Sequence, residues 1–236
     1  MNNIKICGLQ KTTLLDYPGH VAATVFLGGC NFRCPFCHNA DLLSKDAETQ
    51  YTYEELLQFL TKRRHLLEGV CITGGEPTLQ EDALEAFIRD IRRLGLLVKL
   101  DTNGTRPAVL LHLMKENLLD YAAMDIKSSP DHYPQTAGSP CMNLASIQES
   151  VELLKGGSIP YEFRTTVVKG IHTKEDFEQI GPWVSGCPHY YLQNYVASDR
   201  VLKPDGFDSF TKEELLQFAE IVRPYVGEVV LRGIDY

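Results

Sequence analysis

Gly28-Gly29-Cys30-Asn31-Phe32-Arg33-Cys34-Pro35-Phe36-Cys37-His38-Asn39 is the stretch around which the rest of the chain is organised. It directly follows an apolar run over residues 21–27 that is typical of a buried strand. Its three cysteines, Cys30, Cys34 and Cys37, supply soft thiolate ligands, whereas a cubane iron–sulfur cluster has four irons to attach. The next cysteine, Cys71, lies in another apolar run, so we expect one iron of a [4Fe-4S] cluster to lack a protein ligand.

Three other interpretations compete for this loop. The stretch Cys34 to His38 matches the C-x-x-C-H attachment of a c-type haem, but such proteins mature outside the cytosol and the first residues show no signal-peptide pattern. Zinc held by the three cysteines and His38 is chemically reasonable, although adjacent ligands such as Cys37 and His38 rarely reach one tetrahedral ion. A fully ligated electron-transfer cluster would need a fourth cysteine nearby, and the sequence has none there.

Composition limits the class of protein. The 236 residues, of which 44% are hydrophobic, are enough for one domain over residues 1–236 with a sizeable core. The 23 basic and 31 acidic residues leave a net charge of −8, which argues against nucleic acid or an anionic membrane as the main partner. No apolar run approaches the ~18 residues of a membrane span, and we expect a cytoplasmic protein.

Patterns typical of strands and helices alternate after the cysteine loop. A short strand and a turn are expected within residues 4–20, before the strand at 21–27. Later strands are expected over 70–73, 96–101, 121–127, 161–168, 190–195 and 226–231, and helices over 53–67, 81–94, 107–116, 143–155, 174–184 and 212–222. Repeated strand–helix units predict a parallel sheet with right-handed crossovers. Six such units indicate an α/β fold, a partial (β/α)6 TIM-like barrel.

Unusual residues follow the predicted strands. Gly74-Gly75-Glu76 comes after the strand at 70–73, and Asp101-Thr102-Asn103-Gly104 ends and follows the strand at 96–101. Asp125-Ile126-Lys127 closes the strand at 121–127, and Arg164 lies within the strand at 161–168. Parallel barrels carry their chemistry on the loops after the strands, so these groups are expected to meet the cysteine loop at one rim. The loop over 128–143 has no helix or strand pattern and is a candidate clamp on a substrate.

The cysteine loop resembles the radical S-adenosylmethionine (SAM) family, whose signature is C-x-x-x-C-x-aromatic-C with Phe36 in the aromatic place. Cys37-His38-Asn39 is similar to the subset that activates glycyl radical enzymes. The resemblance implies a [4Fe-4S] cluster with SAM at the open iron and a 5′-deoxyadenosyl radical as the reactive species. It implies that Phe36, Asn39, Gly74 and Gly75 lie at the cofactor and that Glu76 meets the amino group of SAM.

Asp101 and Asp125 need a cation, because an unpaired carboxylate inside a barrel costs several kcal/mol. Lys127 is a candidate partner in a structural ion pair. Resemblance to the pyruvate formate-lyase activating enzymes implies instead that Asp101, Thr102 and Asp125 hold a monovalent cation, Na⁺ or K⁺, beside SAM. It also implies that Lys127 lies near the carboxylate of SAM. The paired donors of the Arg164 guanidinium would suit a carboxylate as well.

Two further stretches indicate a branch of this family. Gly8-Leu9-Gln10-Lys11 and Asp16-Tyr17-Pro18-Gly19 resemble the activating proteins of anaerobic (class III) ribonucleoside-triphosphate reductases. In the sixth strand, Leu192-Gln193-Asn194-Tyr195 lacks the histidine that contacts SAM in the pyruvate formate-lyase branch, and Tyr195 or Asn194 is expected to replace it. The resemblance implies a glycyl radical enzyme, the anaerobic ribonucleotide reductase, as partner and a small redox protein as electron donor. Activation of another glycyl radical enzyme, of the pyruvate formate-lyase type, and a non-catalytic iron–sulfur or zinc regulator remain the alternatives.

Overall fold

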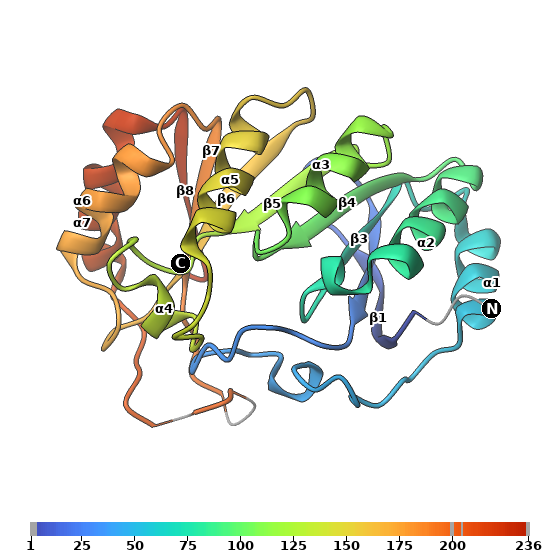
Figure 1. The fold of residues 1–236 in the computed structure, drawn as a ribbon, viewed down its shortest axis with the longest axis horizontal. Coiled ribbons are helices and arrows are strands. Elements are labelled where there is room, and N and C mark those ends of the chain that lie inside the picture. The colour runs from blue at the N-terminus through green and yellow to red at the C-terminus, as the bar shows by residue number, and fades with distance from the viewer. Residues whose placement is uncertain (1–3, 199–200, 204, 235–236) are drawn as a thin grey trace.

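A computed structural model describes residues 4–198, 201–203 and 205–234. In this part of the chain eight strands form one curved sheet, in which their spatial order is their order in the sequence (Figure 1). The strands are β1 (Ile6–Thr13), β2 (Ala22–Leu27), β3 (Gly69–Gly74), β4 (Leu97–Thr102), β5 (Tyr121–Asp125), β6 (Tyr161–Val167), β7 (His189–Asn194) and β8 (Glu228–Arg232). Strands β2 to β8 pair in parallel, whereas β1 pairs with β2 in the antiparallel direction.

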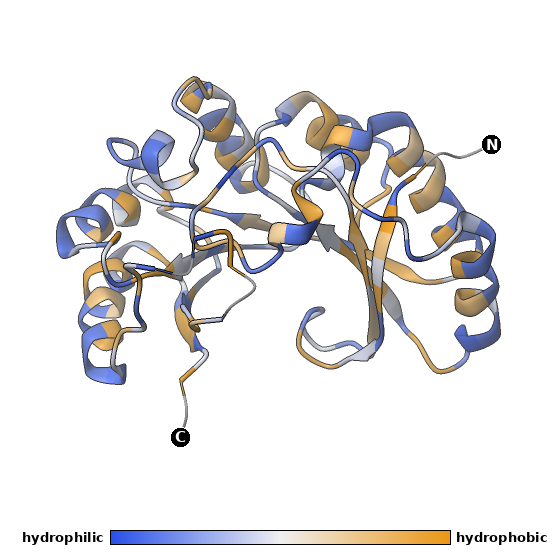
Figure 2. Cartoon of the chain, turned by 90° about the horizontal axis from the view of Figure 1, so that it is seen from below, coloured by the Kyte–Doolittle hydropathy of each residue, from blue (hydrophilic) through white to orange (hydrophobic). Residues whose placement is uncertain are grey.

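Helices cover one side of this sheet. The main helices are α1 (Tyr53–Arg63), α2 (Glu81–Arg93), α3 (Pro107–Lys115), α5 (Leu144–Lys155), α6 (Lys174–Trp183) and α7 (Lys212–Val222). Figure 2 shows them as an arc outside the sheet. No pairing joins β1 to β8 among the described residues, so the barrel is open between these two strands.

The predicted architecture is confirmed, with additions at both edges. Each predicted helix and strand is present with ends within a few residues, and the predicted capping box at Thr52 and Glu55 starts α1. The sequence did not predict that β1 would run antiparallel to β2. It also gave the loop over 128–143 no regular structure, whereas α4 (Tyr133–Thr136) forms a single turn within it.

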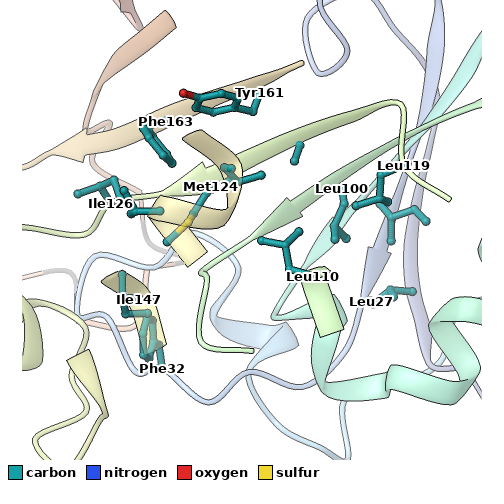
Figure 3. Close-up of a cluster of buried hydrophobic side chains, with 14 of the residues drawn as sticks. Leu27, Phe32, Leu100, Leu110, Leu119, Met124, Ile126, Ile147, Tyr161 and Phe163 are labelled. Atoms are coloured by element: carbon teal, nitrogen blue, oxygen red, sulfur yellow. The ribbon is translucent and has the colours of Figure 1, made fainter. Parts of the chain in front are cut away.

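The core follows from the alternation of side chains along each strand. In β4, Val98 and Leu100 point toward the helices, while Lys99 and Asp101 point into the barrel. Figure 3 shows the apolar layer, in which Leu100 lies close to Leu110 of α3. The inner face of the barrel can therefore carry polar groups.

No helix of the described residues is long and apolar enough to cross a membrane.

Candidate active site

The cysteine loop is held in shape by two glycines and by the side chain of Arg33. Gly29 has φ +90°, a backbone conformation that residues with a side chain rarely adopt. A Cβ at Gly28 would lie 2.6 Å from the Cys7 sulfur. The Arg33 guanidinium donates to the carbonyl oxygens of Cys30 and Phe32, both at 2.7 Å. The loop is thereby fixed directly after β2, at the carboxyl end of the parallel strands.

The expected rim exists as a cavity of about 270 Å³. Cys30, Cys34 and Cys37 line it together with residues from the ends of five other strands or the loops after them. The lining residues that the sequence predicted are Cys30, Cys34, Phe36, Cys37, Asn39, Gly74, Gly75, Asp101, Thr102, Asp125, Lys127 and Arg164. Of the predicted site residues, Glu76 and the two candidates at the end of β7, Asn194 and Tyr195, do not line this cavity.

The Gly74-Gly75 pair has a packing role that the sequence did not predict. A Cβ at Gly74, where φ is +118°, would lie 2.3 Å from the Leu27 carbonyl oxygen, and one at Gly75 would lie 2.2 Å from that of Gly29. The backbone N–H groups of Gly75 and Glu76 donate to these two carbonyls at 2.8 Å. The glycines therefore let the β3 loop pack directly on the cysteine loop, besides exposing backbone to the cavity.

The structure places the Glu76 side chain outside the cavity lining, and its contact with SAM stays a prediction. This carboxylate is fully buried and accepts hydrogen bonds from Thr78, from the Thr102 hydroxyl at 2.8 Å and from the Asn103 backbone N–H at 2.6 Å. Burial raises the pKa of Glu76 above its ordinary value despite these donors. Glu76 thus ties the loop after β3 to the loop after β4.

Charged side chains of three strands form a chain across the inner face. Arg164 of β6 lies between Asp101 of β4 and Asp125 of β5, with nitrogen–oxygen distances of 3.0 and 2.9 Å. Lys99 pairs with Asp101, and Lys127 pairs with Asp125 at 3.0 Å. The structural ion pair that the sequence left open for Lys127 is therefore present.

The pKa values of the two carboxyls follow from burial and from these partners. Burial alone would raise the pKa of Asp101, but Arg164 and Lys99 hold it below its usual value. The pKa of Asp125 is lowered in the same way, against burial, by Arg164 and Lys127. Both groups are thus carboxylates at neutral pH and keep the three basic groups in place.

The residue of β7 that faces the cavity is Gln193, which corrects the expectation of Asn194 or Tyr195. The Asn194 amide donates to the Phe210 carbonyl at 2.8 Å and accepts from the Phe210 N–H at 3.0 Å. Tyr195 is fully buried beside the His38 ring. Gln193 pairs in register with Thr166, which lines the cavity two residues after Arg164. The period of two along β6 could have indicated Thr166, but no signal in the sequence identified Gln193.

The loop over 128–143 lies against the cysteine loop. The Arg33 N–H donates to the Ala137 carbonyl at 2.9 Å, and the Cys34 sulfur lies 3.7 Å from the same oxygen. Gly138, with φ +61°, allows this approach, since a Cβ there would lie 2.1 Å from the Arg33 carbonyl oxygen. The loop therefore supports the cysteines from behind, a role that the sequence did not predict.

The donor set of the cavity fits an iron–sulfur cubane. Each thiolate of a cubane binds its own iron, so three free cysteines around one cavity are the expected arrangement. A single ion would need three ligands to converge on one point, and no group of His, Cys, Asp or Glu among the described residues does so. His38 instead contacts the Val196 carbonyl at 2.7 Å, so the structure gives no support to a zinc site made with His38. Burial raises the pKa of Cys34 to about 12, and iron binding would release that proton.

A family model described as the radical SAM superfamily matches residues 24–181, which is more than half of the chain. The chain belongs to the radical SAM superfamily. Membership implies a [4Fe-4S] cluster and SAM, in agreement with the donor set of the cavity. The chain is accordingly an enzyme, and the fold and cofactor class expected from the sequence are confirmed.

Several relatives resemble this radical SAM enzyme over most of its length. A Methanocaldococcus jannaschii protein, named as a candidate glycyl-radical enzyme activating enzyme, is 34% identical over 239 residues, or 98% of this chain and 96% of the relative. The pyruvate formate-lyase 1-activating enzyme of Escherichia coli is 24% identical over 250 residues, or 96% of this chain and 98% of the relative.

A solved structure shows the same fold. Streptococcus suis SuiB bound to S-adenosylmethionine matches with a TM-score of 0.64 and 15% identity over 86% of this chain. The match covers 48% of SuiB, so the chain spans about half the length of that protein, and the likeness concerns the fold alone.

Proposed function

We propose that this radical SAM enzyme generates a glycyl radical on an anaerobic ribonucleoside-triphosphate reductase. The observation that carries the proposal is the single cavity that joins three free cysteines to a lysine, an arginine and two carboxylates. The relatives named as glycyl-radical enzyme or pyruvate formate-lyase activating enzymes support the general activity. Two features of the sequence favour the reductase as partner: the stretches at residues 8–11 and 16–19, and the absence of a histidine from residues 192–195 at the end of β7.

Residues of the cavity have separable roles in this proposal. Cys30, Cys34 and Cys37 would hold the cluster, which with SAM supplies a 5′-deoxyadenosyl radical when both are bound. The backbone at Gly74 and Gly75 lets a small ligand approach closely, and Lys127 would meet the SAM carboxylate. Apolar side chains of the lining, among them Phe32, Phe36 and Leu43, exclude water from the reacting atoms.

The partner must present a glycine to this cavity. A peptide that carries a reactive glycine has to reach the rim in an extended form, and the barrel is open between β1 and β8. The edge strand β1 includes Gly8-Leu9-Gln10-Lys11, one of the stretches that resemble the reductase activators. An electron would be supplied by a small redox protein.

The first experiment separates an enzyme from a binding protein. Anaerobic reconstitution with iron and sulfide, followed by SAM and dithionite, is expected to yield 5′-deoxyadenosine and methionine. Cys34→Ala should abolish both the visible absorption of the cluster and SAM cleavage, because Cys34 is one of only three cysteines on the cavity. Cys141→Ala is the matched control, since Cys141 is exposed and lies outside the cavity lining, and should leave both unchanged. One bound zinc without sulfide would refute the proposal.

The second experiment identifies the partner. The reconstituted enzyme is mixed with a purified anaerobic ribonucleotide reductase or with a pyruvate formate-lyase, and glycyl radical is measured by electron paramagnetic resonance. We expect the radical signal on the reductase alone. A signal on the lyase alone would retain the activating chemistry and replace the partner with the second candidate, which the Escherichia coli relative favours.

A further inference from the structure

The two carboxylates for which the family resemblance implied a monovalent cation are already neutralised by this chain's own side chains. Asp101 Oδ1 accepts from Lys99, and Asp101 Oδ2 accepts from Arg164 at 3.0 Å. Asp125 Oδ1 accepts from Arg164 at 2.9 Å, and Asp125 Oδ2 accepts from Lys127 at 3.0 Å. Every carboxylate oxygen that would bind the ion therefore has a charged donor.

The third expected ligand is committed as well. The Thr102 hydroxyl donates to Glu76 at 2.8 Å and accepts from the Gly104 N–H at 3.1 Å. A sodium or potassium ion takes oxygen ligands from several groups at once, and the three predicted groups are turned to other partners. The residues present do not fit the ion that the family resemblance implied.

The charges of the inner face lead to the same conclusion. Three basic groups, Lys99, Arg164 and Lys127, face the two aspartates. The next carboxylate, Glu162, is fully buried, and its Oε1 lies 4.0 Å from Arg164 and 3.8 Å from Arg232. An additional cation between the aspartates would lie beside Arg164, and like charges at such a distance repel strongly away from bulk water.

We propose that the Arg164 guanidinium takes the place of the monovalent cation, so that SAM binding by this protein does not depend on Na⁺ or K⁺. A guanidinium stays charged at every physiological pH and can donate hydrogen bonds to two carboxylates at once. It can therefore bridge the two carboxylates as a coordinated metal ion would. The inference rests on the SAM binding that is part of the proposed function, but not on the identity of the partner.

The test compares equilibrium SAM binding in three salts. Full-length, cluster-reconstituted protein is titrated with SAM anaerobically in KCl, NaCl or choline chloride at equal ionic strength. The dissociation constants are expected to agree within about twofold. A tenfold or greater tightening in K⁺ or Na⁺ over choline would overturn the inference.

A pair of variants tests the role of the guanidinium itself. Arg164→Gln removes the charge between the aspartates, so its SAM affinity should fall in choline chloride and recover when K⁺ or Na⁺ is added. Arg232→Gln is the control, because Arg232 stacks on Tyr191 and does not contact either aspartate, and it should remain insensitive to the salt. Weakened binding by Arg164→Gln that no salt restores would argue against the exchange of guanidinium for cation.

The two proposals fail differently. Equal SAM binding in the three salts without glycyl radical on any partner would overturn the proposed function alone. Formation of the glycyl radical with SAM binding that requires K⁺ or Na⁺ would overturn the present inference alone.

Discussion

At the scale of single residues, Glu76 is a buried carboxylate that links two loops beside the cavity. Its neighbours Gly74 and Gly75 line the cavity, but the Glu76 carboxylate is turned into the protein, where it joins the loops after β3 and β4. A buried carboxylate with several donors stabilises the fold mainly because its removal would leave those donors without an acceptor.

Glu76→Gln should therefore destabilise the protein in the absence of SAM. The amide that replaces one oxygen would face donors such as the Asn103 N–H, and a buried donor without an acceptor costs about 1–3 kcal/mol. Urea unfolding of the SAM-free protein measures this loss. Glu81→Gln is the control, because Glu81 lies in an exposed ion pair with Arg106 and should change stability by less than about 0.5 kcal/mol. Unchanged stability with weakened SAM binding would mean that Glu76 contacts SAM directly.

At the scale of elements, the loop over 128–143 acts on the cysteines from outside the cavity. Its turn α4 and the residues after it contact the cysteine loop through the Ala137 carbonyl, and Tyr133 and Phe32 pack edge to face at 6.4 Å. The contact is close only because Gly138 has no side chain.

Gly138→Ala should loosen this support and shorten the lifetime of the reconstituted cluster. The substitution adds a Cβ 2.1 Å from the Arg33 carbonyl and strains a positive φ, which by itself costs about 1–3 kcal/mol. The rate at which the visible absorption bleaches under an iron chelator measures the effect. Gly186→Ala is the matched control, since Gly186 also has a positive φ but nothing lies within 4 Å of its added Cβ. Equal bleaching rates for the two variants would show that the loop does not support the cluster.

At the scale of the whole molecule, the inner face of the barrel is held together by charge. Lys99, Asp101, Asp125 and Arg164 come from strands β4, β5 and β6, and Lys127 follows β5. Outside the sheet the same strands pack through apolar side chains, as Figure 3 shows for Leu100 and Met124. The helices therefore join these strands on the outer face, and the ion pairs join them on the inner face.

This arrangement predicts loss of stability in acid. The pKa values of Asp101 and Asp125 are lower in the folded protein than in the unfolded chain, so the unfolded chain binds more protons at acidic pH. The stabilisation is fully present above the pKa of the unfolded chain, about 3.9, and is lost as the pH falls toward the pKa values of the folded protein. Each unit by which a folded pKa lies below the unfolded one contributes about 1.4 kcal/mol to the stability at neutral pH. Urea unfolding of the metal-free protein between about pH 5 and pH 2.5 should show this slope.

The variant Asp101→Asn tests the source of the slope. It should lower the stability near neutral pH, because Lys99 and Arg164 lose a charged partner, and should make the dependence on acid shallower. Glu116→Gln, in an exposed pair with Arg89, should retain the slope of the unchanged protein. An equal slope in Asp101→Asn would assign the acid sensitivity to other carboxyls.

Local spacing and periodicity in the sequence were enough to determine the strand–helix order, the helix start at Thr52 and the cysteine loop as the centre of the site. These features depend on neighbours along the chain, where a period of two or of 3.6 and the spacing of ligands act directly. The convergence of Asp101, Asp125, Lys127 and Arg164 could also be predicted, because parallel strands present their carboxyl ends at one rim.

Tertiary structure alone decided which side chains turn toward that rim. Glu76 turns away because donors of another loop satisfy it, Gln193 faces the cavity because Phe210 holds the next residue, and Arg164 lies between two aspartates because β6 pairs beside β5. Each outcome depends on a group far away in the sequence. No local pattern records such a group, since distant residues meet only after the sheet has formed.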